Sequence, residues 1–114
     1  MFPLGLFGHG LYFGENSSKS DEYCQAGPDG LFPLLVVRTI IGNPYVAMEP
    51  LNWLRRPPCV QGHQVCGHAR FNTVLGETNP SLAGVQPYLK RHREFVVYDK
   101  NEVYVEFVLW YRRV

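Results

Sequence analysis

Two long apolar segments rich in β-branched and aromatic residues set the strongest limit on how this chain can fold. The first, LLVVRTII, covers residues 34–41, and the second, VYVEFVLWY, covers residues 103–111. Such segments favour extended strands because branched and aromatic side chains pack well on a pleated surface. We expect the first strand to be buried on most sides. The second is apolar on both faces apart from Glu106, which predicts a central position in a sheet.

Two shorter segments are further strand candidates. Residues 11–13 form a short apolar run entered through glycines, and residues 94–98 lie just before the last apolar segment. The connection at residues 99–101 has the length of a hairpin loop. We therefore expect the strand at residues 94–98 to pair directly with the last strand.

One short helix is expected near the N-terminus. Asn16 or Ser17 can cap it, and it should run to about Cys24. Residues 42–85 are interrupted by prolines, which predicts irregular structure with one short strand near residues 71–75. The fold class is therefore α+β: a β-rich chain of mainly antiparallel strands with one short helix.

Length and composition narrow the class of protein. The chain has 114 residues, which predicts one domain, and 46% of them are hydrophobic, which excludes compositional disorder. A net charge of +1 gives no electrostatic support for a nucleic-acid or membrane partner. The odd cysteine count predicts reduced thiols rather than a disulfide framework. Since no signal peptide or membrane span is recognisable, we expect an intracellular location, nuclear or cytoplasmic.

Four potential metal ligands fall close together: Cys59, His63, Cys66 and His68. Two cysteines and two histidines could close a tetrahedral zinc site. Their spacing is compressed, however, and no helix is predicted to present them. We interpret the cluster as chance and expect no metal.

The first predicted strand and the short helix after it carry three hydroxyl groups that lie close together in the sequence. Ser20 and Tyr23 are three residues apart, so a helix presents them on one face, and Tyr12 lies on the preceding strand. The two tyrosines could sandwich a flat ring while the serine bonds a polar substituent of that ring. The alternative is that both tyrosines are half-buried packing residues and Ser20 is solvated.

Glu94 is a second candidate functional residue. It opens a strand of otherwise apolar or aromatic residues, where a carboxylate can act on a ligand at the end of the sheet. A fixed anion at such a place stabilises positive charge that develops on a ligand. The alternative is a surface ion pair with Arg91 or Arg93.

These segments resemble a known family. The stretch GHGLYFGENSSKSDEYC is similar to the nicotinamide-pocket segment of poly(ADP-ribose) polymerase catalytic domains, the diphtheria-toxin-like ADP-ribosyltransferases. The similarity resumes at LLVVRTIIG and at FNTVLGE, and it ends in REFVVYDKNEVYVEFVLWY, which resembles the glutamate strand and closing hairpin of the family. It spans most of the chain, with a divergent middle from Pro44 to Ala69.

The resemblance implies a role for each matching residue. Tyr12 and Tyr23 would bracket the nicotinamide ring of NAD, and the Ser20 hydroxyl would bond its carboxamide. Lys19 would lie at the edge of the pocket, with Gly10 in the same NAD-binding segment. Glu94 would be the catalytic carboxylate. The implied activity is NAD-dependent transfer of ADP-ribose, a pentosyl transfer, to a protein or nucleic-acid acceptor, with release of nicotinamide.

One expected motif is absent from the 114 residues. The family carries a histidine-glycine-threonine or histidine-glycine-serine strand that holds a ribose of NAD, and His9-Gly10 lies in a different motif. We therefore expect residues 1–114 to be the C-terminal half of such a domain, a fragment or part of a larger parent chain, which alone binds no NAD. Two functions stay open: an ADP-ribosyltransferase, or an inactive remnant that binds another protein through an open sheet edge.

Overall fold

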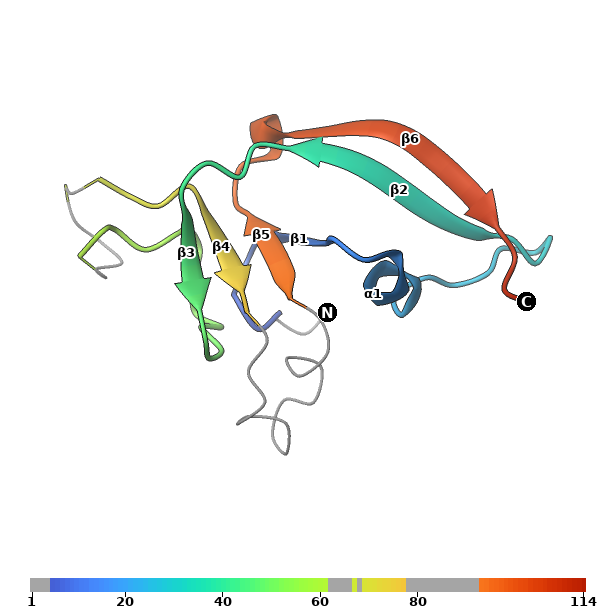
Figure 1. Ribbon diagram of the computed structural model, residues 1–114, viewed down its shortest axis with the longest axis horizontal. Helices are drawn as coiled ribbons and strands as arrows, with labels where there is room; N and C mark the ends of the chain where they lie inside the picture. Colours follow the sequence, from blue (N-terminus) through green and yellow to red (C-terminus); the bar gives the residue numbers. More distant parts are fainter. Residues whose placement is uncertain (1–4, 62–66, 68, 78–92) are drawn as a thin grey trace.

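The computed structural model describes residues 5–61, 67, 69–77 and 93–114, and these form two separate β-sheets with one short helix (Figure 1). The elements are β1 (Leu11–Gly14), α1 (Ser17–Asp21), β2 (Phe32–Thr39), β3 (Pro44–Ala47), β4 (Thr73–Gly76), β5 (Glu94–Val97), a 3₁₀ helix (Lys100–Glu102) and β6 (Val103–Tyr111). The predicted β-rich α+β class is confirmed, and most strand pairs are antiparallel as expected.

A four-stranded sheet in the order β1-β5-β4-β3 carries the hydrophobic core. β5 is antiparallel to both of its neighbours, and β3 runs parallel to β4. The segment before β1 and the segment around Leu54 cover one face of this sheet, linked by a 2.8 Å bond from His9 N to Leu54 O. The fully or almost fully buried residues of this core are Phe7, Ala47, Leu54, Val74 and Val96.

β2 and β6 pair with each other in a two-stranded antiparallel ribbon, which extends away from the four-stranded sheet (Figure 1). Val36 lies opposite Phe107 and Val37 opposite Val105, so Glu106 is the extra residue of a β-bulge on β6. Its carboxylate forms an ion pair with Arg38 on the neighbouring strand. This pair explains the one charge in an otherwise apolar strand.

The expected burial of the two long strands is wrong. β6 lies at an edge rather than in the centre of a sheet, with Phe107 60% and Trp110 61% exposed. Leu35 on β2 is 56% exposed. The physical reason is that a two-stranded ribbon has no further strand beside it, and within the described residues its faces are only partly covered.

The expected hairpin between residues 94–98 and 103–111 is also wrong. β5 pairs with β1 and β4, whereas β6 pairs with β2. Asp99 caps the 3₁₀ helix by accepting a 2.9 Å bond from Asn101 N, and Glu102 O accepts from the Thr39 hydroxyl at 2.9 Å. These contacts direct the chain from the four-stranded sheet into the ribbon. A tight turn at the same place would have folded the chain back onto β5.

Other boundaries differ less. β1 matches its predicted position, α1 ends at Asp21 rather than near Cys24, and β4 begins two residues later than the predicted strand. β3 lies in the proline-interrupted region and was not predicted. Its first residue is a proline, which has no N–H to donate to a ladder, so sequence alone favours a loop there. In the described ranges no helix has the length and apolar content needed to span a bilayer.

Candidate functional site

The pairing of β1 with β5 places two predicted site residues on one face of the sheet. Tyr12 lies opposite Val96, and Gly14 lies opposite Glu94. Cross-strand partners share a face and every second residue returns to it, so Tyr12 and Glu94 both lie on the face that carries the core. Glu94 stands at the end of that face, where β1 ends and the chain turns into α1.

Glu94 is buried there beside a lysine. Its side chain is 8% exposed, and its Oε1 lies 3.6 Å from Nζ of Lys19, whose side chain is 3% exposed. Each charge depends on the other here, because removing either one leaves the other buried and uncompensated. A Cβ at Gly14 would approach the Lys19 side chain to 3.2 Å. The glycine therefore gives the lysine room to reach Glu94 across the end of β1.

Lys19 also joins Tyr23 to this cluster. Its Nζ lies 5.2 Å from the centre of the Tyr23 ring, over the ring face, and 3.8 Å from Oε2 of Glu22. The Tyr23 side chain is 71% exposed, so one ring face is free to meet a ligand. The arrangement offers a carboxylate, an ammonium and an open aromatic ring within one short stretch of surface.

Tyr12 has a different environment from Tyr23. Its hydroxyl donates to Gly8 O at 2.7 Å and accepts from Phe7 N at 3.1 Å. Burial is the main cause that raises the pKa of this hydroxyl above its ordinary value, and the nearby Glu94 charge adds to it. The Tyr12 hydroxyl therefore stays neutral and holds the segment before β1, while its ring contacts the core.

Ser20 lies beside a cavity of about 440 Å³ between the four-stranded sheet and β2. Phe13 and Phe95 pair with each other on the sheet face opposite to Tyr12 and Glu94, and both line the cavity. Ser20, Cys24, Leu34 and Val37 also line it, and Tyr12 contributes to its wall. Lys19, Tyr23 and Glu94 are not part of its lining, so the charged cluster and the apolar cavity are neighbouring features separated by β1 and α1.

Gly10 is explained by packing. A Cβ there would lie 2.4 Å from a methyl of Val96, so only glycine lets this part of the chain approach β5. Gly10 therefore sets the position of β1 relative to the catalytic candidate on β5, whether or not it also contacts a ligand.

Arg93 does not pair with Glu94. Its guanidinium binds the Glu15 carboxylate through two hydrogen bonds, one of them 2.9 Å between Nη2 and Oε2, and its Nη1 lies 3.6 Å from Glu77. The hydrogen bond from Arg93 lowers the pKa of Glu15. The surface-pair alternative for Glu94 thus fails for Arg93, and Arg91 lies outside the described residues. Arg93 instead ties the ends of β1, β4 and β5 together beside Glu94.

Comparisons of the sequence with known proteins give the family of the chain. A sequence model of the family described as "Poly(ADP-ribose) polymerase catalytic domain" matches residues 2–113. The chain belongs to this family. It is also 30% identical over 120 residues to the protein named "Poly [ADP-ribose] polymerase 1" of Caenorhabditis elegans, an alignment that covers 91% of this chain. The chain spans 13% of the length of that relative.

Of the four potential zinc ligands in the sequence, the structure describes only Cys59. Cys59 is buried, bridges to Arg70 in an isolated β-bridge and accepts a 3.3 Å bond from Gln61 N. His63, Cys66 and His68 lie outside the described residues. Among the residues that the structure describes, no group of three potential ligands gathers at one place.

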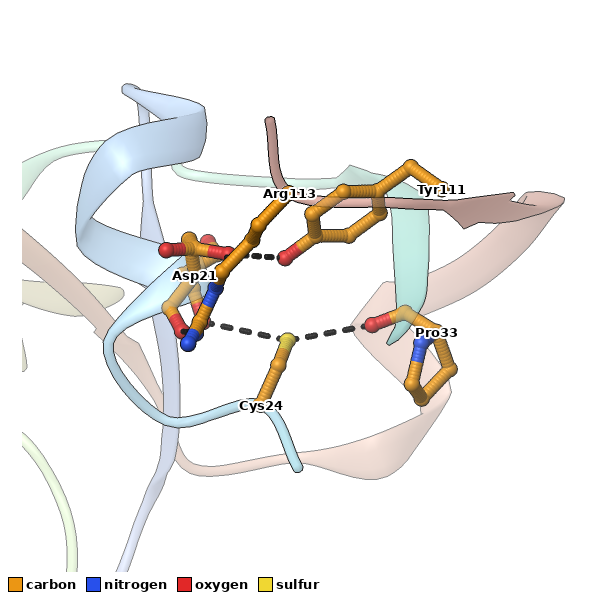
Figure 2. Close-up of polar contacts among 6 residues, drawn as sticks. Asp21, Cys24, Pro33, Tyr111 and Arg113 are labelled. Carbon is orange, nitrogen blue, oxygen red and sulfur yellow. Dashed lines mark hydrogen bonds and ion pairs between the residues drawn. The ribbon is translucent and has the colours of Figure 1, made fainter. Parts of the chain in front are cut away.

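Sequence reasoning missed a polar cluster at the C-terminal end of α1. Tyr111 and Arg113, from the end of β6, both bind Asp21, and these two hydrogen bonds lower its pKa (Figure 2). Cys24 Sγ lies 3.3 Å from Ser20 O and 3.0 Å from Pro33 O. The available signal was an aspartate in the last turn of a predicted helix, where a negative charge is unfavourable unless a partner compensates it. In this domain the partners lie about 90 residues away in the sequence, which no local pattern reveals.

Proposed function

We propose that this chain functions as an NAD-dependent ADP-ribosyltransferase, in which Glu94 is the catalytic carboxylate. The observation that carries the proposal is the cluster of Glu94, Lys19 and Tyr23. A buried carboxylate is paired with a lysine, and that lysine lies over an exposed aromatic ring. Within a family named for ADP-ribose polymerisation, these groups match the requirements of the reaction.

The reaction breaks the bond between C1′ of the ribose and the nicotinamide nitrogen, and the electron pair leaves with nicotinamide. Positive charge then develops on the ribose ring. The Glu94 carboxylate, fixed beside Lys19, would stabilise that charge because it is buried and needs no reorganisation. Hydrogen-bonded to the 2′-hydroxyl, it would also orient the sugar and help remove the proton of the attacking acceptor.

Nicotinamide would stack on the exposed ring of Tyr23, with Ser20 as the nearest hydroxyl for its carboxamide and Tyr12 behind it. Ser20 now lines the neighbouring cavity, so this pose requires its side chain to turn toward Tyr23. The acceptor would be a protein side chain or a nucleic acid. Because the 114 residues contain no histidine-glycine-threonine motif, we propose that a strand from additional polypeptide completes the NAD site. The chain joined to that strand is called the completed domain below.

Tyr23→Ala tests the proposed ring contact. In the completed domain we expect NAD and nicotinamide to bind more weakly by ~1–3 kcal/mol, because stacking and buried apolar area are lost. Isothermal titration measures both ligands. Tyr104→Ala is the matched control, since Tyr104 is 68% exposed on β6, far from the cluster in sequence, and Tyr23 is 71% exposed.

Equal affinities of the Tyr23→Ala protein and the unsubstituted protein, with an intact fold, would return Tyr23 to a packing role. Saturable NAD binding by the 114-residue chain alone would show that the histidine strand is dispensable.

The second candidate function is a non-catalytic protein-interaction module. One observation favours it: the β2/β6 ribbon exposes Val105, Phe107, Val108 and Trp110, and no strand among the described residues pairs with the outer edge of either strand. A partner chain could add a strand to either edge. Transfer activity that depends on Glu94 would exclude this as the sole function.

A further inference from the structure

Three of the proposed site residues lie on α1 or just after it. The helix is too short to be stable by itself. It has five residues, and its N-cap Asn16 makes no side-chain capping bond. Isolated helices of this length are unstable in water, since a single turn fixes many torsions for few hydrogen bonds. Lys19, Ser20 and the following Tyr23 therefore depend on contacts from elsewhere in the fold.

Several of these contacts come from the end of β6. The Tyr111 hydroxyl donates to Oδ1 of Asp21. Arg113 donates from Nε to the same oxygen at 3.0 Å and from Nη2 to the Asp21 backbone oxygen at 2.8 Å. The last residue of the helix is thus held at both its side chain and its backbone.

The holding groups are themselves fixed by aromatic packing. The Tyr111 ring stacks on Phe32, its cross-strand partner, with centroids 5.6 Å apart, and Arg113 lies 4.1 Å above the same Phe32 ring. Cys24, which follows Tyr23, bridges Ser20 O and Pro33 O. Figure 2 shows Asp21, Cys24, Pro33, Tyr111 and Arg113 converging between α1 and the end of the ribbon. Tyr23 therefore lies between two points of attachment, Asp21 and Cys24.

We propose that Tyr111 and Arg113 are positioning residues for the nicotinamide site, acting through Asp21 to hold Ser20 and Tyr23 in place. The inference rests on the proposed function, because it assigns these residues a role in binding the same ring. Neither residue touches the proposed ligand. Two features support this role. Tyr111 and Arg113 belong to the end of the ribbon rather than to the four-stranded sheet. The aspartate that they bind lies at the C-terminal end of a helix, where negative charge is unfavourable.

Tyr111→Phe is the sharpest test. It removes one hydroxyl and keeps the ring on Phe32. Nicotinamide is titrated into the ¹⁵N-labelled completed domain, and the dissociation constant is read from amide shifts. We expect Tyr111→Phe to weaken nicotinamide binding about three- to tenfold, the range of one net hydrogen bond. Amide exchange at Tyr23 and Cys24 should accelerate, while exchange at Val74 and Val96 in the sheet core stays unchanged.

Controls separate positioning from general stability. Tyr104→Phe removes a hydroxyl from the other end of β6 and should leave nicotinamide binding unchanged. Arg113→Gln should act like Tyr111→Phe, whereas Arg112→Gln, at the neighbouring position, should not. Asp21→Asn, which keeps an acceptor for the Tyr111 hydroxyl, should lose less affinity than Asp21→Ala.

The outcomes distinguish the two proposals. If the unsubstituted completed domain binds no nicotinamide, the proposed function and this inference both fail. If it binds nicotinamide and Tyr111→Phe binds equally well with unchanged exchange at Tyr23, only the positioning role fails. A loss of affinity accompanied by faster exchange throughout the four-stranded sheet would also overturn it, because the hydroxyl would then support the fold as a whole.

Discussion

At the scale of single residues, the central observation is the buried pair of Glu94 and Lys19. The sequence indicated Glu94 as a candidate functional carboxylate, and the family resemblance implied Lys19 at the edge of the same pocket. The common face of Tyr12 and Glu94 follows from the two-residue period of the paired strands. The direct contact between Lys19 and Glu94 could not be predicted, because it depends on the space above Gly14 and on the angle at which α1 leaves β1.

Tyr12→Phe tests the structural half of the role of Tyr12. The substitution deprives Phe7 N and Gly8 O of the hydroxyl that now joins them. We expect the free energy of unfolding to fall by about 1–2 kcal/mol, measured by urea denaturation, because two partly buried backbone groups lose a partner. Tyr45→Phe is the control, a partly buried tyrosine that packs on the same core. Equal losses in both variants would contradict this assignment.

At the scale of elements, β1, the start of α1 and β5 could be predicted from local patterns, and they are the elements that carry the site. The pairing of the long strands could not. The 99–101 connection has the length of a hairpin loop, but Asp99 and Glu102 use their hydrogen bonds to start a 3₁₀ helix and to bind Thr39. The bond between Glu102 and Thr39 joins residues 63 positions apart, so the choice between two sheets depends on a tertiary contact.

The ion pair between Arg93 and Glu15, which helps to join the ends of β1, β4 and β5, should weaken at low pH. Since Arg93 lowers the pKa of Glu15, the stabilisation from this pair is fully present above the ordinary value of 4.5 and is lost as pH falls through the lowered pKa. We expect Glu15→Gln to reduce the midpoint of thermal unfolding by about 1–4 °C at pH 7. The difference from the unsubstituted protein should shrink toward pH 3. Calorimetry at several pH values measures it, with Glu49→Gln on an exposed loop as control, and a pH-independent difference would refute the assignment.

At the scale of the whole molecule, the chain is more open than a compact domain of its length. Its radius of gyration is 15.3 Å, against about 13 Å for a compact chain of this length. The core lies on one side of the four-stranded sheet, and the ribbon extends from that sheet (Figure 1). The ribbon exposes apolar side chains. The sequence predicted apolar strands correctly. Their exposure could not be predicted, because burial depends on which neighbours a strand has rather than on its own residues.

Because the chain is open, the central question is whether the active unit is the completed domain. The exposed apolar ribbon favours binding to further polypeptide, and the cluster around Glu94 favours catalysis. Both expectations are compatible if the completed domain is the active unit. The interaction-module alternative differs in one respect: it assigns no chemical role to the charge of Glu94.

Glu94→Gln in the completed domain is the most direct test of that role. The substitution preserves size and most hydrogen-bonding geometry while removing the charge. ADP-ribose transfer from labelled NAD is measured together with NAD affinity, and Glu102→Gln, on the 3₁₀ helix, is the control. We predict that transfer falls by roughly 10²–10³ while NAD affinity changes by less than about threefold, as expected for a group that stabilises only the developing charge. Transfer at the unsubstituted rate in Glu94→Gln, with NAD still bound, would contradict the catalytic role of this carboxylate.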